Sequence, residues 1–237
     1  MQFKPTFDVL RDPKNAVRPA DVGGCGIAVF RRGDKTLVYM LDHHWRNKAF
    51  DMVDMCFADD FGIKPDVLVA EMENDCYERK LIPQWFQHAN PVHAIGVAAK
   101  KKIPVVFADL SPNQMVEVVN VGFPNNQITR EGLSKVLNAQ LNSDGDINQQ
   151  MHAYLCLNGR DRFMLQNIAE ALNKYNNVFA IFGNMHYAME YLVLEDMMGK
   201  PEYITKIKNM RGDFSDVKIE PIKLCEFEMV KDDDKKS

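Results

Sequence analysis

Short apolar runs that alternate with helical stretches constrain the fold of this chain more than any other feature. Apolar segments lie at residues 65–72, 103–109 and 178–182, each bounded by polar or turn-forming residues. Runs of this length are typical of strands buried on both faces of a sheet. The stretches between them carry apolar residues at helical spacing, and such alternation favours an α/β fold with a mostly parallel central sheet.

The N-terminal part of this sheet is expected to be antiparallel. Strands are predicted at 27–31 and 36–41, on either side of Gly33-Asp34. A short turn of this type joins adjacent antiparallel strands. We therefore expect an antiparallel N-terminal hairpin beside the parallel strands, with helices on both faces of the sheet.

The length of the chain suits one large domain. Its 237 residues, 46% of them hydrophobic, are enough to form a substantial core. No repeat or linker divides the sequence, so a single domain is expected over 1–230. It would carry a helical insertion at about 120–176 and one or two late strands within 217–230. The charged segment 231–237 has little to bury and is expected to be a disordered tail.

Charge and hydropathy argue against several classes of partner. The formal net charge is −4 with both signs interspersed, which does not favour a nucleic-acid surface. The sequence has no apolar run of about 18 residues and no signal-peptide pattern, so we expect a cytoplasmic protein without membrane association.

Motifs that are missing narrow the chemistry further. The five cysteines show no Cys-x-x-Cys spacing, which supports neither a disulfide framework nor a structural zinc site. Most of them are expected to be small buried apolar residues. The sequence lacks a phosphate-binding loop, a dinucleotide glycine motif after a strand and a Gly-x-Ser-x-Gly elbow. Nucleotide enzymes and serine hydrolases are therefore disfavoured.

Polar residues follow four of the expected strands. Ligands of open α/β sheets bind at the carboxyl ends of the strands, so these side chains are expected to converge there. Carboxylates and imidazoles together suit acid–base chemistry or a divalent metal. The residues in question are Asp42, His43, His44, Glu71, Glu73, Asp109, Asn184 and His186.

His186 has the most specific setting among these residues. It follows Gly183 in the sequence Gly-Asn-Met-His, after the last apolar run and before a helix expected at about 187–198. A loop histidine in this place would lie beside the free N–H groups of the helix start, where an oxyanion or phosphate can bind.

Structural roles compete with these functional ones. Asp109 precedes Ser-Pro and would cap the helix that follows. Glu71 would form a salt bridge as readily as it would serve catalysis. Taken alone, His43 and His44 would be ordinary loop histidines.

Basic residues open the helix expected at 161–176. Arg160 and Arg162 would bind a substrate anion or orient Glu71, because the guanidinium fork suits carboxylates. The alternative is an exposed basic helix start. The remaining histidines, which show no ligand spacing and are expected to be structural, are His88, His93 and His152.

The order of these motifs resembles the TraB/Tiki superfamily, which also includes the ChaN-like haem-binding proteins and the erythromycin esterases. The family pattern is a first Gly-x-x-His after a hairpin strand, a strand ending in Glu, an Arg at a helix start, and a second Gly-x-x-His. The resemblance extends over about residues 27–200, and its matching segments are Leu41–His44, Glu71, Arg160 and Gly183–His186. Leu41 stands where the family usually has Gly, so the first motif is aligned on either His43 or His44.

This resemblance implies a hydrolase that activates water for attack on a peptide, amide or ester bond. His44, Glu71 and His186 would hold a divalent metal such as Mn, Zn or Co. Without metal, His44 would be the general base, Glu71 would orient it, and Arg160 with His186 would stabilise the oxyanion.

The resemblance leaves other assignments open. Asp42, His43 and Asn184 would contribute to cofactor binding beside the catalytic residues. The alternative functions are a non-enzymatic protein that binds haem or a metal in the same crevice, and an inactive scaffold. The expected partner is a small-molecule or peptide substrate, with no nucleic acid and no membrane, and a homodimer is left open.

Overall fold

A computed structural model describes residues 2–13, 16, 26–42, 48–73, 90–141, 145–206 and 221–229 of the chain. The first histidine pair, His43 and His44, lies outside the described residues. So do His88, two of the cysteines (Cys25 and Cys76) and the tail at 231–237.

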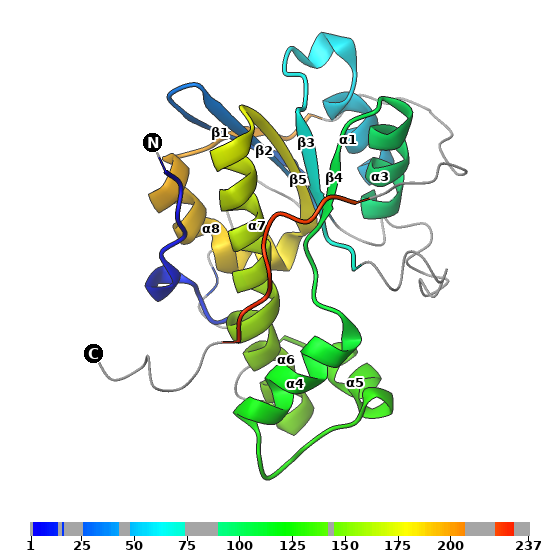
Figure 1. Cartoon of the computed structure of the whole chain (residues 1–237), viewed down its shortest axis with the longest axis vertical. Coiled ribbons are helices and arrows are strands. Elements are labelled where there is room, and N and C mark those ends of the chain that lie inside the picture. The colour runs from blue at the N-terminus through cyan, green and yellow to red at the C-terminus, as the bar shows by residue number, and fades with distance from the viewer. Residues whose placement is uncertain are drawn as a thin grey trace.

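The fold is α/β, built around a six-stranded mixed sheet. Its strands are β1 (Gly26–Arg32), β2 (Lys35–Asp42), β3 (Val67–Ala70), β4 (Val105–Phe107), β5 (Asn177–Gly183) and β6 (Glu202–Ile204). They lie in the order β4-β3-β5-β2-β1-β6, as Figure 1 shows for the central strands. The pairs β4–β3, β3–β5 and β5–β2 are parallel, whereas β1 pairs antiparallel with β2 and with β6. Both the expected class and the antiparallel N-terminal hairpin are confirmed.

Helices cover both faces of the sheet, as expected. The helices are α1 (Lys48–Cys56), α3 (Asn90–Lys100), α4 (Pro112–Gly122), α5 (Arg130–Leu137), α6 (Ile147–Leu155), α7 (Asp161–Lys174) and α8 (Asn184–Met198). A π-helical turn at Cys156–Arg160 joins α6 to α7, and short 3-10 turns lie at Phe7–Val9 and Asp59–Phe61. Figure 1 shows α1 and α3 on one side of the sheet and α7 and α8 on the other.

The alternation of side chains along each strand explains the two layers. In β3, Val67 and Val69 contact the core under α7 and α8, whereas Leu68 and Ala70 contact the core under α1 and α3. The crossovers from β2 to β3 and from β3 to β4 pass through α1 and α3. The return from β4 to β5 runs in the opposite direction through α7 on the other face, as the right-handedness of such connections requires.

A third core lies beyond the sheet, between α4, α5 and α6 (Figure 1). Its buried residues are Leu110, Met115, Val118, Val119, Leu133, Val136, Met151, Leu155 and Phe163. Of the helices between β4 and β5, therefore, α7 packs on the sheet while α4 to α6 form a unit next to its edge.

Two expectations about local structure are wrong. Helix α8 begins at Asn184 rather than near 187, so His186 lies in its first turn and not in a loop. Of the segment 217–230 in which late strands are expected, residues 217–220 and 230 lie outside the described part, and residues 221–229 form no strand. Ile222 donates one backbone hydrogen bond to Val105, and the segment runs past α7 in Figure 1. The strand that pairs with β1 on the side away from β2 is β6. Its three residues are too few for an alternation of apolar and polar residues to be visible in the sequence.

None of the described helices is long and apolar enough to cross a membrane.

Candidate functional site

The carboxyl ends of the parallel strands bring three acidic residues to one edge of the sheet. Asp42 ends β2 directly opposite Gly183, the last residue of β5. Glu71 follows β3, and Asp109 lies two residues beyond β4, which is paired with β3. Asp42, Glu71 and Asp109, all predicted from the sequence, therefore share the edge at which ligands of open α/β sheets bind.

Glu71 turns toward the α7 and α8 side of the sheet, because it continues the alternation of Val67 and Val69. One carboxylate oxygen, Oε2, accepts the backbone N–H of Gly183 at 2.6 Å. The other, Oε1, accepts a hydrogen bond from Arg160 Nη2 at 2.9 Å. The side chain is only 5% exposed, so the salt bridge considered for Glu71 is present but buried.

Arg160 joins Glu71 to Asp109. Its Nε donates to Asp109 Oδ1 at 2.9 Å, and its Nη2 donates to Asp109 Oδ2 at 2.7 Å as well as to Glu71. Burial alone would lower the pKa of Arg160, but the two carboxylates outweigh it and hold that pKa well above its usual value. The guanidinium therefore stays charged and fixes both acids in place.

The helix-capping role expected for Asp109 is wrong. The cap of α4 is Ser111, whose Oγ accepts the backbone N–H of Gln114. Asp109 accepts only the N–H of Leu110 from the chain that leads into this helix, and its carboxylate is directed to Arg160.

His186 lies between two acids in the first turn of α8. Its Nδ1 is 3.1 Å from Asp161 Oδ1, and its Nε2 is 3.5 Å from Glu71 Oε1. Burial lowers the pKa of His186, but the charges of Asp161 and Glu71 outweigh that effect and raise the pKa well above its usual value. Each ring nitrogen therefore lies beside a carboxylate, an arrangement that favours the imidazolium form.

A second layer of buried polar groups lies behind His186. Glu190, one helical turn further along α8, accepts a hydrogen bond from the Tyr39 hydroxyl at 2.8 Å. Burial, with the nearby charges of Asp161 and Glu71, raises the pKa of Glu190 well above its usual value. Among the described residues, Asp161 Oδ2 and Glu190 Oε1 are buried side-chain atoms without a hydrogen-bond partner.

The π-helical turn at Cys156–Arg160 determines which side chains of this helix face the site. The backbone N–H of Asp161 donates to the carbonyl of Cys156, five residues earlier. Residues five apart lie about 140° apart around an α-helix, but a π-turn stacks one above the other. Gly159 lets the turn pack closely on α4, since a Cβ there would come to 3.3 Å from the Cγ atoms of Val118.

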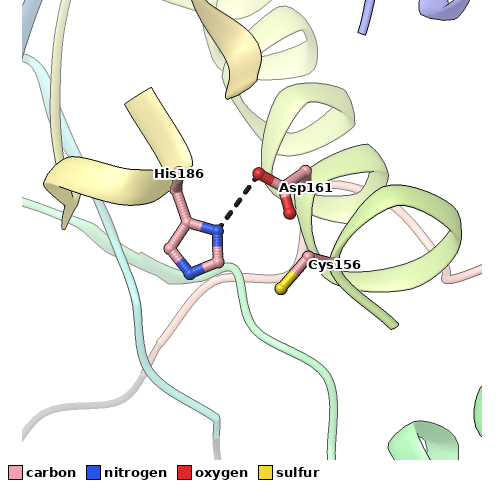
Figure 2. A group of neighbouring side chains, drawn as sticks. All are labelled: Cys156, Asp161 and His186. Carbon is pink, nitrogen blue, oxygen red and sulfur yellow. Dashed lines mark hydrogen bonds and ion pairs between the residues drawn. The ribbon is translucent and has the colours of Figure 1, made fainter. Parts of the chain in front are cut away.

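As a result, Cys156, Asp161 and His186 point toward one another, as Figure 2 shows. One candidate ligand atom from each of the three side chains lies within 4.8 Å of the others, and all three residues are buried. A thiol, a carboxylate and an imidazole form a donor set that suits a divalent transition metal.

The remaining sequence-predicted residues occupy different places. Asp42 is buried at the end of β2, and Asn184 is half-buried as the first residue of α8. Arg162 points away from the network, donating to the carbonyl of Leu157 and covering the ring of Phe7. His43 and His44 lie outside the described residues.

The two other histidines of the described part make separate contacts. His93 pairs with Asp54 at 2.7 Å between α3 and α1, and His152 Nδ1 lies 2.7 Å from the carbonyl of Ala139. Burial lowers the pKa of His152 to about 4, so its ring is neutral.

Several residues of this site were missed from the sequence. Asp161 directly follows Arg160, and Glu190 follows His186 by four residues, a spacing that shares a helix face. Both features are visible in the sequence and indicate side chains near Arg160 and His186. Cys156 gave none, because its position depends on a π-turn that apolar periodicity does not reveal.

Comparison of the chain with protein-family models, with curated proteins and with solved structures finds no match. The resemblance to the TraB/Tiki superfamily therefore depends on the order of the motifs alone.

Proposed function

We propose that this chain is a hydrolase of the TraB/Tiki type that activates water for attack on a peptide, amide or ester bond. The observation that carries the proposal is the meeting of Glu71, Arg160 and His186 in one buried network at the carboxyl edge of the sheet. These residues are far apart in the sequence and come from three different elements.

The cost of this network supports a functional role. Buried charges are expensive to desolvate, and an apolar cluster of the same volume would often stabilise a fold as well or better. Strongly shifted pKa values, such as those of His186 and Glu190, gather at sites of chemistry more often than elsewhere.

The charge state of His186 favours one division of roles. Because its pKa is raised, His186 favours the charged form, and its positive charge, together with that of Arg160, would stabilise a developing oxyanion electrostatically. The general base would then be His44, which follows Asp42 by two residues in the sequence. Glu71, fixed by Arg160 and the Gly183 N–H, would orient the imidazoles.

Metal assistance remains part of the proposal. A bound divalent metal would lower the pKa of water and supply a nucleophile near neutral pH. Both oxygens of Glu71, which the resemblance makes a metal ligand, accept hydrogen bonds from Arg160 and from the Gly183 N–H. Its contacts suit a positioning residue.

The test is hydrolysis of a substrate panel by the purified full chain, before and after addition of Zn²⁺, Mn²⁺ or Co²⁺. The panel comprises p-nitrophenyl esters, aminoacyl p-nitroanilides and a fluorescent casein. We expect turnover of at least one class, and a loss of about 10²- to 10³-fold in kcat for His186→Gln and Arg160→Gln.

Arg162→Gln is the matched control, because Arg162 lies two residues from Arg160 but outside the network. It should retain full turnover. A folded His186→Gln variant with undiminished turnover would contradict the proposal. Absence of turnover on the whole panel would also contradict it, and would favour a binding protein.

A further inference from the structure

We infer that Cys156, Asp161 and His186 form a binding site for one divalent transition metal, with Zn²⁺ or Co²⁺ as the fitting ions. We call these residues the π-turn cluster. The inference names ligands for the metal of the proposed hydrolase. Metal binding itself does not depend on the proposed function; only the catalytic role of the metal rests on it.

The geometry of the cluster is close to that of a tetrahedral site. Ligand atoms about 2.0–2.3 Å from a tetrahedral ion lie roughly 3.3–3.6 Å from one another. His186 Nδ1 and Asp161 Oδ1 are 3.1 Å apart, and the candidate atoms of all three residues lie within 4.8 Å. Side-chain rotations that close roughly an ångström would bring the set onto one ion.

A second observation points independently to a ligand in this place. Asp161 is 0% exposed, and its Oδ2 has no hydrogen-bond partner among the described residues. Leaving such an oxygen buried and unsatisfied is costly, and native proteins avoid it. A cation held between Asp161, Cys156 and His186 would satisfy it.

The surroundings of His186 match the outer shell that metal-bound histidines require. An ion on Nδ1, the nitrogen next to Asp161, would replace the Nδ1 proton and take over the positive charge assigned to His186 in the metal-free site, while Nε2 remains directed at Glu71 Oε1 at 3.5 Å. Glu71 is held in turn by Arg160. A carboxylate on the second ring nitrogen is the usual arrangement for fixing the orientation of a metal-ligating histidine.

The donor set also selects among ions and leaves room for a reactant. Thiolate and imidazole ligands favour Zn²⁺ and Co²⁺, whereas Mn²⁺ prefers oxygen. Three protein ligands leave the fourth tetrahedral position for water, as in catalytic rather than structural zinc sites. On this inference His186 keeps the ligand role expected of it, and Cys156 and Asp161 would act as ligands where the sequence predicts His44 and Glu71.

The experiment uses the full chain, purified without a histidine tag, stripped with a chelator and titrated with Co²⁺. Saturation at about one ion per chain with a near-ultraviolet thiolate-to-cobalt charge-transfer band is expected. Cys156→Ser should abolish this band. Asp161→Asn should weaken binding at least about 10-fold, since even the loss of an outer-shell partner costs about 10- to 100-fold.

Cys56→Ser is the matched control, because Cys56 is equally buried but lies at the end of α1 on the opposite face of the sheet. Its band should be unchanged. A band that persists in Cys156→Ser, or a stripped wild-type chain that binds neither Co²⁺ nor Zn²⁺, would overturn the inference. Should Cys156→Ser fail to fold, Asp161→Asn decides by the same titration.

The two proposals fail in different ways. If the chain shows a cobalt band that depends on Cys156 but hydrolyses no substrate of the panel, the metal site is supported and the hydrolase function is contradicted. If hydrolysis persists after chelator treatment and in Cys156→Ser, and no cobalt band forms, the metal site is contradicted and the hydrolase function is supported.

Discussion

Arg160 and Asp109 form a two-pronged ion pair, with Nε and Nη2 of the guanidinium donating to the two carboxylate oxygens at 2.9 and 2.7 Å. The pair joins the end of β4 to the turn that precedes α7, 51 residues later. The pair holds in place the π-helical turn that carries Cys156 and Arg160 and leads directly into Asp161. It therefore connects the edge of the sheet to the candidate site.

This ion pair is expected to contribute strongly to stability. Asp109→Ala would leave the buried charge of Arg160 with Glu71 alone, and breaking a buried pair costs about 3–5 kcal/mol in the free energy of unfolding. Urea denaturation measures this difference. Asp59→Ala, at an exposed acid, is the control and should change stability by less than about 0.5 kcal/mol. A loss below about 1 kcal/mol for Asp109→Ala would mean that Arg160 does not depend on this partner.

The protonation state of Glu190 can be tested through its pair with Tyr39. Since burial and the charge of Asp161 raise the pKa of Glu190, the acid favours its neutral form, and Glu190→Gln replaces it with a neutral group of the same shape. We expect this variant to change the free energy of unfolding by less than about 1 kcal/mol. Tyr39→Phe removes the hydroxyl that donates to this fully buried carboxyl and should cost about 1–3 kcal/mol.

Thermal or urea unfolding of both variants at pH 7 gives the comparison. The reverse order, with Glu190→Gln the more damaging change, would show that Glu190 carries a charge that its neighbours need.

The fold was largely predictable because its signals are local. The apolar runs at 65–72 and 178–182 marked buried strands, and Gly33, with its φ of 63°, marked the hairpin turn. The three residues of β6 gave no periodic pattern, and its place in the sheet depends on pairing with β1. Its formation is a tertiary effect that local propensity does not contain.

The site was predictable only in part, for a different physical reason. A strand ending in Glu71 and a histidine after Gly183 are visible because they interrupt apolar runs. The partners of these residues depend on three-dimensional packing. The sequence around Asp109 predicts helix capping, because an acid before Ser-Pro commonly caps the helix that follows. The partner of Asp109 in the structure is instead Arg160. Cys156 reaches the site only through the π-turn.

The buried thiol of Cys156 should be a poor nucleophile in the metal-free protein. Burial, with a smaller effect of Asp161, raises its pKa to about 12, so the reactive thiolate is scarce at pH 8. Iodoacetamide labelling followed by mass spectrometry should leave Cys156 unmodified until the protein unfolds. Half-buried Cys225 should react before Cys156. Rapid native labelling of Cys156 would show instead an activated cysteine, and would reopen a cysteine-dependent hydrolysis.

His152 is expected to make stability depend on pH in a defined window. Its pKa is about 4 in the folded protein and near 6.5 when unfolded, because burial disfavours the charged ring. Between these values the unfolded chain binds a proton that the folded chain does not, so stability falls as the pH falls from 6.5 to 4. At 1.36 kcal/mol per pKa unit, the full contribution is about 3 kcal/mol.

His152→Gln isolates this contribution from the titration of other groups. The Gln amide can still donate to the carbonyl of Ala139, which His152 contacts at 2.7 Å, but it does not titrate. Urea unfolding at pH 7 and pH 4.5 should therefore show a smaller loss of stability for the variant, by about 2–3 kcal/mol. Equal losses in the two proteins would mean that His152 is protonated in the folded state and that the carbonyl of Ala139 outweighs the effect of burial.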